Sequence, residues 1–232
     1  MKNFLIVGAS SGIGYALAQI LIAENHKVFS ASRQQPRNLA IAQHFTIDVS
    51  QSPNSFNFDL PEELHGLAYC PGTINLKPFN RLTLQDFLTD FQVNVLGAVS
   101  IIQSVLPKLK KAQGASVVLF STVAAQVGMS FHASIATAKA GIEGLTKSLA
   151  AELALQQIRV NAIAPSLTNT PLASKILTNA ERIEASNKRH PIGRIGQAQD
   201  VAHLAHFLLS DKSAWLTGQI IGLDGGMGTL KP

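Results

Sequence analysis

Short apolar runs alternate along the chain with longer segments in which apolar residues recur every three or four positions. The short runs are rich in β-branched residues, which is typical of strands buried on both faces. The longer segments have the spacing of amphipathic helices. The predicted strands are residues 3–8, 27–32, 64–69, 115–121, 157–163 and 219–223, and the predicted long helices are residues 12–25, 83–111, 132–155 and 197–210.

This alternation predicts an α/β protein with a Rossmann-type, doubly wound parallel sheet and helices on both faces. Right-handed crossovers are expected to join the strands, because strand, helix and strand pack back onto one sheet only with that hand. No internal repeat or interdomain linker interrupts the pattern. We therefore expect one domain over residues 1–232.

Three segments carry a weaker pattern. Residues 33–47 predict a short helix and a strand ending near Ile47, and the polar, proline-containing residues 50–63 predict a loop. Residues 171–195 hold prolines and glycines around a polar helix and form the longest excursion between late strands. Such an excursion commonly covers a ligand, so we expect a substrate lid at residues 171–195.

Composition and charge exclude several classes of protein. No apolar stretch approaches the roughly 20 residues of a membrane span, and the first apolar run stops at Gly8, too early for a signal peptide. Cys70 is the only cysteine, which rules out a disulfide framework and favours a cytoplasmic protein. The net charge is +5, but the basic residues are scattered among acidic ones, which favours a mixed surface over a nucleic-acid patch.

A glycine-rich turn follows the first predicted strand. Glycines permit a tight turn and let the backbone approach a pyrophosphate, whose charge then lies on the N–H groups of the following helix. The spacing differs from G-x-G-x-x-G, but its place between a strand and a helix favours dinucleotide binding over a plain turn. The predicted cofactor-binding residues of this turn are Gly8, Ser10, Ser11, Gly12, Ile13 and Gly14.

The residues that end the second strand point to the kind of dinucleotide. An acidic residue there would bind a ribose 2′-hydroxyl and repel a 2′-phosphate, whereas Ser32 and Arg33 can bind that phosphate. This favours NADP (NADPH) over NAD, although a surface arginine is the simpler alternative. Asp48 and Val49, after the next predicted strand, are candidates for the adenine, although an aspartate there can also be a turn residue.

Motifs along nearly the whole chain resemble those of the classical short-chain dehydrogenase/reductase family in order and spacing. They are the glycine turn, Asp48, Asn94 within Gln92-Val93-Asn94-Val95, Lys139 within Ala138-Lys139-Ala140-Gly141, Arg159-Val160-Asn161-Ala162, and Leu216-Thr217-Gly218 through Asp224-Gly225-Gly226. The resemblance implies that Gly72, Lys139, Pro165 and Thr168 also bind the cofactor, with Thr168 at the nicotinamide carboxamide.

The resemblance also implies catalytic roles. In this family a tyrosine four residues before the lysine is the acid or base, the lysine binds the nicotinamide ribose, a serine polarises the substrate oxygen and an asparagine holds a water. Lys139, Thr122 and Asn94 occupy three of these positions, with Thr122 still offering a hydroxyl. Ile135 occupies the position of the tyrosine and offers no proton.

Further departures from the family pattern lie in two places. Tyr69, Cys70 and Pro71 stand where the family usually has Asn-Asn-Ala, and Pro71 has no N–H to donate. Cys70 fits a small buried hydrophobe better than a nucleophile. Ser166 replaces the glycine that usually follows Pro165 and is expected to tighten the floor of the nicotinamide pocket.

His132 is a candidate for the missing proton donor. It lies seven residues before Lys139, which places both on one helix face if the helix starts early enough, and related enoyl reductases carry a tyrosine at that spacing. A histidine can donate a proton near neutral pH. The alternative is a histidine in the loop before the helix with no catalytic role.

Two functions remain open at this stage. One is an NADP-dependent oxidoreductase that transfers hydride to a carbonyl or activated double bond of a small-molecule substrate, with altered proton-donor chemistry. The other is a catalytically impaired dinucleotide-binding protein, a sensor or structural component of the same fold. The resemblance and the apolar faces near residues 95–106 and 142–153 predict a homodimer or homotetramer, with no nucleic-acid or membrane partner and no metal.

Overall fold

The computed structural model describes residues 1–51 and 56–231 and contains a seven-stranded parallel sheet. The strand order is β3-β2-β1-β4-β5-β6-β9. Strands β1 to β3 follow one another toward one edge of the sheet, and the chain then crosses over β1 so that β4, β5, β6 and β9 extend to the other edge. A separate two-stranded pair, β7 with β8, lies outside this sheet. The strands are β1 Asn3–Val7, β2 Lys27–Ser32, β3 Gln43–Thr46, β4 Gly66–Tyr69, β5 Ser116–Phe120, β6 Arg159–Pro165, β7 Thr168–Asn169, β8 Gly196–Gln197 and β9 Ile220–Leu223.

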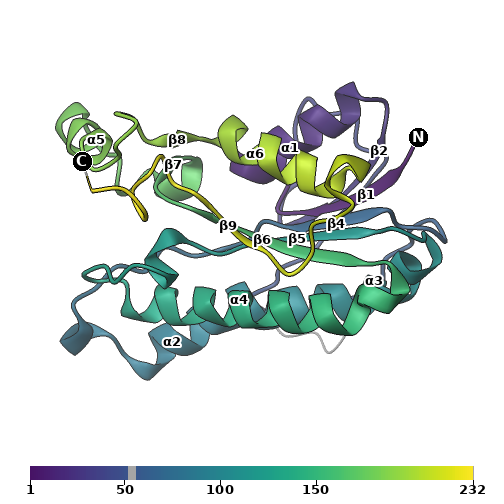
Figure 1. Ribbon diagram of the computed structural model, residues 1–232, viewed down its shortest axis with the longest axis horizontal. Coiled ribbons are helices and arrows are strands. Elements are labelled where there is room, and N and C mark those ends of the chain that lie inside the picture. The colour runs from purple at the N-terminus through teal and green to yellow at the C-terminus, as the bar shows by residue number, and fades with distance from the viewer. Residues whose placement is uncertain (52–55, 232) are drawn as a thin grey trace.

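Helices cover both faces of the sheet (Figure 1). One face carries α1 and α6, which pack against each other, and the other carries α2, α3 and α4. The small helix α5 lies apart from these layers, near the C-terminus. The helices are α1 Gly12–Ala23, α2 Leu84–Phe91, α3 Gly97–Lys111, α4 Ala133–Leu153, α5 Ala180–Asn187 and α6 Ala198–Leu209.

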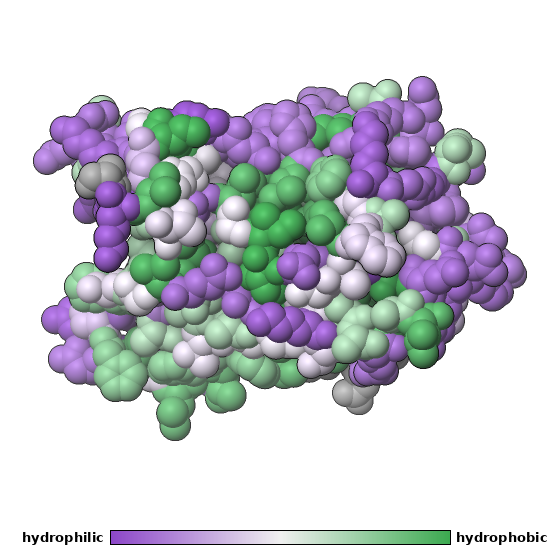
Figure 2. Space-filling model, in the orientation of Figure 1, coloured by the Kyte–Doolittle hydropathy of each residue, from purple (hydrophilic) through white to green (hydrophobic). Residues whose placement is uncertain are grey.

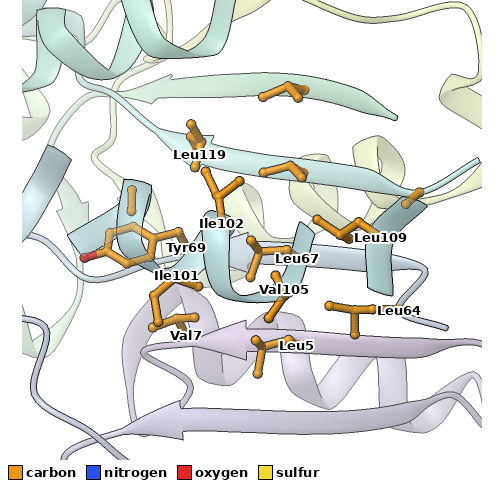
Figure 3. Packing of buried hydrophobic residues seen from close by; sticks show 14 of the residues in the cluster. Leu5, Val7, Leu64, Leu67, Tyr69, Ile101, Ile102, Val105, Leu109 and Leu119 are labelled. Atoms are coloured by element: carbon orange, nitrogen blue, oxygen red, sulfur yellow. The ribbon is translucent and has the colours of Figure 1, made fainter. Parts of the chain in front are cut away.

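The strands are apolar on both faces because the sheet separates two hydrophobic layers. In β1, Leu5 and Val7 belong to the layer beneath α3 and α4, while Phe4 and Ile6 belong to the layer beneath α1 and α6. Figure 3 shows the first layer, in which Ile101 of α3 packs toward the strands. Burying each such side chain contributes about 1.5–3 kcal/mol, so this pattern determines the fold.

The predicted strands and long helices are confirmed, with ends that agree to within about two residues. A strand in residues 33–47 is also confirmed as β3, but the short helix expected before it is wrong. Residues 33–42 form turns and bends, and Asn38 has a φ of +58°, outside the helical region. Leu39 and Ile41 pack against the α1 and α6 layer without a helix. Of the predicted loop at 50–63, the described residues contain no helix or strand, and residues 52–55 lie outside the described chain.

The predicted helix at 83–111 is helical throughout but contains a π-helical turn, Gln92–Leu96, between α2 and α3. Tyr69, at the end of β4, lies beneath this turn and donates a hydrogen bond from its hydroxyl to the carbonyl oxygen of Val93 (2.6 Å). A Cβ atom at Gly97 would lie 2.3 Å from that hydroxyl, so glycine makes room for the ring. Figure 3 shows Tyr69 at one end of the hydrophobic layer.

The surface in this orientation is mostly hydrophilic at its margins (Figure 2). Hydrophobic residues gather in its middle, along the course of β9, which is an edge strand of the sheet. Trp215, shortly before β9, is fully exposed. Within the part of the chain that the structure describes, no helix has the length and apolar character needed to cross a membrane.

Candidate active site

Two adjoining clefts open at the carboxyl ends of the strands. The larger has a volume of about 670 Å³ and the smaller about 230 Å³. Cys70, Gly72 and Thr73, which follow β4, line both, so the clefts are continuous. The carboxyl edge of a doubly wound sheet is where such folds bind ligands.

The glycine turn forms the floor of the larger cleft. Gly8 and Gly12 have φ values of +83° and +58°, in the left-handed region that favours glycine. A Cβ atom at Gly14 would lie 2.5 Å from the carbonyl oxygen of Gly8, so only glycine lets α1 start this close to β1. No side chain caps the N-terminus of α1 at Ser11, which leaves its first N–H groups directed at the cleft. These features fit a pyrophosphate, and the whole predicted turn, Gly8, Ser10, Ser11, Gly12, Ile13 and Gly14, lines this cleft.

The predicted ribose and adenine residues lie at the far end of the same cleft. Arg33 is exposed there, with its guanidinium available to an anion. The Asp48 carboxylate accepts hydrogen bonds from the backbone N–H (2.9 Å) and hydroxyl (2.7 Å) of Ser50. These bonds, aided by the charge of Arg33, lower the pKa of Asp48 and keep it ionised near neutral pH. The lining here consists of Ser32, Arg33, Asp48 and Val49.

Lys139 is a buried lysine at the smaller cleft. Its side chain reaches from α4 to the end of β5, where Nζ donates a hydrogen bond to the carbonyl oxygen of Phe120 (2.7 Å). Burial lowers the pKa of Lys139 to about 8, and the negative charge of Asp90 opposes that shift. Ile135, one turn earlier on α4, lines the same cleft. The cleft therefore has an ammonium group beside an aliphatic side chain.

Thr122 and His132 also line the smaller cleft. Thr122 Oγ1 accepts a hydrogen bond from the backbone N–H of Ala124 (3.3 Å), which leaves its hydroxyl proton free to donate. His132 precedes α4 as its N-cap residue, so the helix does not start early enough to include it beside Lys139. Its Nδ1 lies 2.7 Å from the carbonyl oxygen of Ser130 and must carry the proton, because a carbonyl only accepts.

Asn94 lines neither cleft and lies buried beneath them in the π-helical turn. Its side-chain amide donates to Thr73 Oγ1 (2.9 Å) and to the carbonyl oxygen of Asp90 (2.7 Å). Its Oδ1 has no partner among the described residues. A Cβ atom at Gly72 would lie 3.3 Å from this oxygen, so the free acceptor is directed at the wall that both clefts share.

A buried carboxylate beside Asn94 was not expected from the sequence. Asp90 of α2 accepts hydrogen bonds from the hydroxyls of Thr73 (2.6 Å) and Ser134 (2.5 Å). Asp90 is four residues before Asn94, a helical spacing that places both on one face of the segment. The arrangement ties α2 to the start of α4 and supplies the negative charge that opposes the lowered pKa of Lys139.

The contact between a serine and a histidine in the smaller cleft was not expected from the sequence. Ser166, which follows β6, has its Oγ 2.8 Å from Nε2 of His190. Nδ1 of His190 lies 2.8 Å from the carbonyl oxygen of Ser186, and the ring is 4% exposed. Ser166 was visible as a departure from the family glycine, but nothing in the spacing of the two residues indicated their contact.

Four further residues that the sequence singled out have clear surroundings. Pro165 and Thr168 line the smaller cleft, and Thr168 Oγ1 donates to the carbonyl oxygen of Ser166 (3.1 Å). Burial raises the pKa of the Cys70 thiol to about 12, so it stays protonated and fits a packing role better than that of a nucleophile. Tyr69 lines neither cleft, since its hydroxyl is held by Val93, and it cannot replace the missing tyrosine.

Residues of the excursion at 171–195, where a lid is predicted, form one wall of the smaller cleft. Leu172, Ala173 and Ile176 give this wall an apolar surface, and Arg189 adds a positive charge at the exposed rim. Among the described residues that line the smaller cleft, none is acidic. The site therefore suits a largely apolar molecule that carries a polar or anionic group.

Known proteins with similar sequences include reductases. Residues 8–228 match the family model described as enoyl-(acyl carrier protein) reductase. The 3-oxoacyl-[acyl-carrier-protein] reductase FabG of Thermotoga maritima is 31% identical over 241 residues, which cover 97% of this chain and 97% of that protein. A tropinone reductase homolog of Arabidopsis thaliana is 30% identical over 241 residues, which cover 97% of this chain and 92% of that protein.

Solved structures agree with these sequence matches. A short chain dehydrogenase family protein of Francisella tularensis superposes with a TM-score of 0.88 at 27% identity, covering 99% of this chain and 100% of that one. An Agrobacterium tumefaciens protein described as a candidate 2-deoxy-d-gluconate 3-dehydrogenase, solved with bound NADP, gives 0.88 at 28% identity, covering 97% of this chain and 96% of that one. The chain belongs to the short-chain dehydrogenase/reductase family of oxidoreductases.

Proposed function

We propose that this protein is an NADP-dependent oxidoreductase that reduces a carbonyl or activated double bond in a small, largely apolar substrate. The observation that carries this proposal is the continuity of the two clefts. The glycine turn that suits a pyrophosphate opens directly into the cleft that holds Lys139 and Thr122. A dinucleotide laid along the first cleft would present its reactive ring in the second.

The preference for NADP is supported by the end of β2. Ser32 and Arg33 line the larger cleft where the ribose would lie, and the exposed guanidinium could pair with a 2′-phosphate. Asp48, an acidic residue of the same lining whose pKa the charge of Arg33 helps to lower, accepts hydrogen bonds from Ser50. The similar Agrobacterium tumefaciens protein was solved with NADP, which fits the same assignment.

Three residues of the smaller cleft would hold the nicotinamide end. Lys139, fixed by the carbonyl oxygen of Phe120, would donate to the ribose hydroxyls. Pro165 and Thr168 would face the ring and its carboxamide, since both line the cleft at the end of β6. When bound, the nicotinamide supplies the hydride, and the protein supplies orientation and electrostatic stabilisation.

Thr122 is the residue placed to polarise the substrate. Its hydroxyl proton is free, and a hydrogen bond to the substrate oxygen would stabilise the negative charge that develops there. Ile135 contributes shape but no proton. Loss of a general acid costs roughly 10²–10⁴-fold in rate, so a second proton source is needed for efficient turnover.

Two measurements test this function. Binding of NADPH and of NADH is followed by fluorescence titration, and oxidation of NADPH is followed with a panel of ketones, aldehydes and enones, with and without a carboxylate. We expect tighter binding of NADPH and turnover of at least one apolar substrate. Tight binding with no turnover across the panel would favour the rival function, a dinucleotide-binding sensor or structural protein. The rival is considered because Ile135 supplies no proton.

A further inference from the structure

Ser166 and His190 form a hydrogen-bonded pair in the wall of the smaller cleft. Both residues line the cleft with Thr122 and Lys139. They come from separate elements, since Ser166 follows β6 and His190 follows α5. Their atoms Oγ and Nε2 lie 2.8 Å apart, which is hydrogen-bond distance.

The surroundings of His190 fix which of its nitrogens carries a proton. Nδ1 faces the carbonyl oxygen of Ser186 at 2.8 Å, and a carbonyl can only accept, so Nδ1 is the N–H in the neutral ring. Nε2 is then an acceptor and takes the hydroxyl proton of Ser166. In the protonated ring Nε2 becomes a donor, Ser166 Oγ accepts, and the hydroxyl proton is released to point elsewhere. Protonation of His190 thus frees a proton donor in the cleft.

We propose that Ser166 donates the proton to the reduced substrate and that His190 resupplies it. This rests on the proposed function. A hydride adds to the substrate carbonyl carbon, and the C=O π pair moves onto oxygen. The oxygen takes the proton of Ser166 Oγ, and Oγ takes the Nε2 proton of His190, which becomes neutral and is reprotonated from solvent. Ser166 is the catalytic residue, and His190 is a positioning residue that acts through it.

The other polar groups near the cleft fit this role less well. Ser134 and Thr73 direct their hydroxyl protons at the carboxylate of Asp90, so neither proton is free for a substrate. His132 also lines the cleft, but its Nδ1 proton is directed at the carbonyl oxygen of Ser130 (2.7 Å). Ser121, which also lines the cleft, donates its hydroxyl proton to the carboxylate of Glu143 (2.7 Å). The Ser166 and His190 pair instead places a hydroxyl in the cleft with a histidine behind it.

Several charged or titratable groups lie near the pair. Arg189 is next to His190 in the chain, and Lys139 and His132 line the same cleft. Asp224 lies on the C-terminal segment that packs on the histidine, but both of its oxygens accept backbone hydrogen bonds within its own turn. Proton delivery requires the protonated ring of His190, because only then does Nε2 donate to Ser166, so it is expected to weaken as the pH rises.

The test uses the full chain and four variants, Ser166→Ala, Ser166→Thr, His190→Gln and, as a matched control, His203→Gln. His203 is an exposed histidine of α6 that lines neither cleft. Ring-nitrogen NMR of the nucleotide-free protein follows the tautomer and the titration midpoint of His190. Turnover against pH, and the Kd for NADPH, are measured on the same samples.

We expect Ser166→Ala to lower kcat by about 10²-fold with a Kd for NADPH within twofold of the wild type. We expect the same variant to change the Nε2 signal of His190. Ser166→Thr keeps the hydroxyl and retains most activity, whereas His190→Gln abolishes the pH step whose midpoint matches the NMR titration. An active wild type with an unaffected Ser166→Ala, or a pH step unrelated to His190, overturns the relay. A wild type that binds NADPH but reduces nothing overturns the proposed function, and the relay with it.

Discussion

Ile135 and Lys139 lie one turn apart on α4, and both side chains line the smaller cleft. A phenol at position 135 would therefore lie beside a buried ammonium group, which lowers the pKa of a phenol. We expect Ile135→Tyr to increase the rate of simple ketone reduction at least tenfold, because Thr122 and Asn94 are already in place. Steady-state kinetics with NADPH measures this.

The matched control is Ile135→Phe, which adds the ring without the hydroxyl. It separates proton donation from a change in cleft shape. Equal rates for the Tyr and Phe variants would show that the added hydroxyl plays no part in proton transfer.

Arg33 is expected to determine the preference between the two nucleotides. Arg33→Ala removes one charge-assisted phosphate contact, which is worth about 1.5–3 kcal/mol or roughly ten- to a hundredfold in Kd for NADPH. The Kd for NADH should change little. Arg37→Ala is the control, since Arg37 is exposed nearby but does not line the cleft. Similar Kd values for the two nucleotides in the wild type would contradict this assignment.

Lys139 should make the stability of the protein depend on pH. Its pKa is lowered to about 8 from 10.5, so between these values the unfolded chain binds more protons than the folded one. The free energy of unfolding therefore rises with pH across this window, by up to about 3 kcal/mol from this residue. Lys139→Met removes that rise, whereas Lys147→Met, an exposed lysine of the same helix, keeps it. Urea unfolding of the nucleotide-free protein at pH 7 to 10 measures it.

Tyr69 and Gly97 should depend on each other energetically. Gly97→Ala places a methyl group against the Tyr69 hydroxyl, and overpacking of this kind costs about 1–3 kcal/mol. Tyr69→Phe removes the hydroxyl and its bond to Val93, so it is destabilising alone but should relieve part of the clash in the double variant. A double-mutant cycle by denaturant unfolding gives the coupling energy, and strictly additive effects would contradict the packing described here.

We expect a homodimer or homotetramer in solution. The exposed Trp215 and the hydrophobic residues gathered along β9 in Figure 2 add to the apolar faces of the long helices. An edge strand also presents unpaired backbone groups to a second copy. Light scattering at micromolar concentration gives the mass, and Trp215→Arg should reduce it if this edge is an interface. A monomeric wild type would contradict the prediction.

The fold was predictable because its signals are local and repeated. The apolar runs and the glycine turn each encode their own element, and the sheet order follows from parallel crossovers. The short helix expected in 33–47 did not form, because Leu39 and Ile41 partly bury their side chains from an irregular segment and need no helix to do so. Periodicity cannot distinguish these cases over so few residues.

The site was predictable only where single positions carry the chemistry. Lys139 and Thr122 were found from the motif and lie together in the structure. Pairs of residues that the tertiary fold brings together have no corresponding pattern in the sequence. Ser166 and His190 meet across 24 residues, and Asp90 meets Ser134 across 44, so neither spacing corresponds to any local period.

The shared wall of the two clefts has a consequence for how ligands bind. Cys70, Gly72 and Thr73 would contact whatever occupies either cleft, so binding in one cleft is expected to change binding in the other. Each would alter the dissociation constant of the other by the same factor, because thermodynamic linkage is reciprocal. A dinucleotide that binds first would form part of the surface against which the substrate packs. The segment of residues 70–73 directly after β4 is therefore where binding in the two clefts would be coupled.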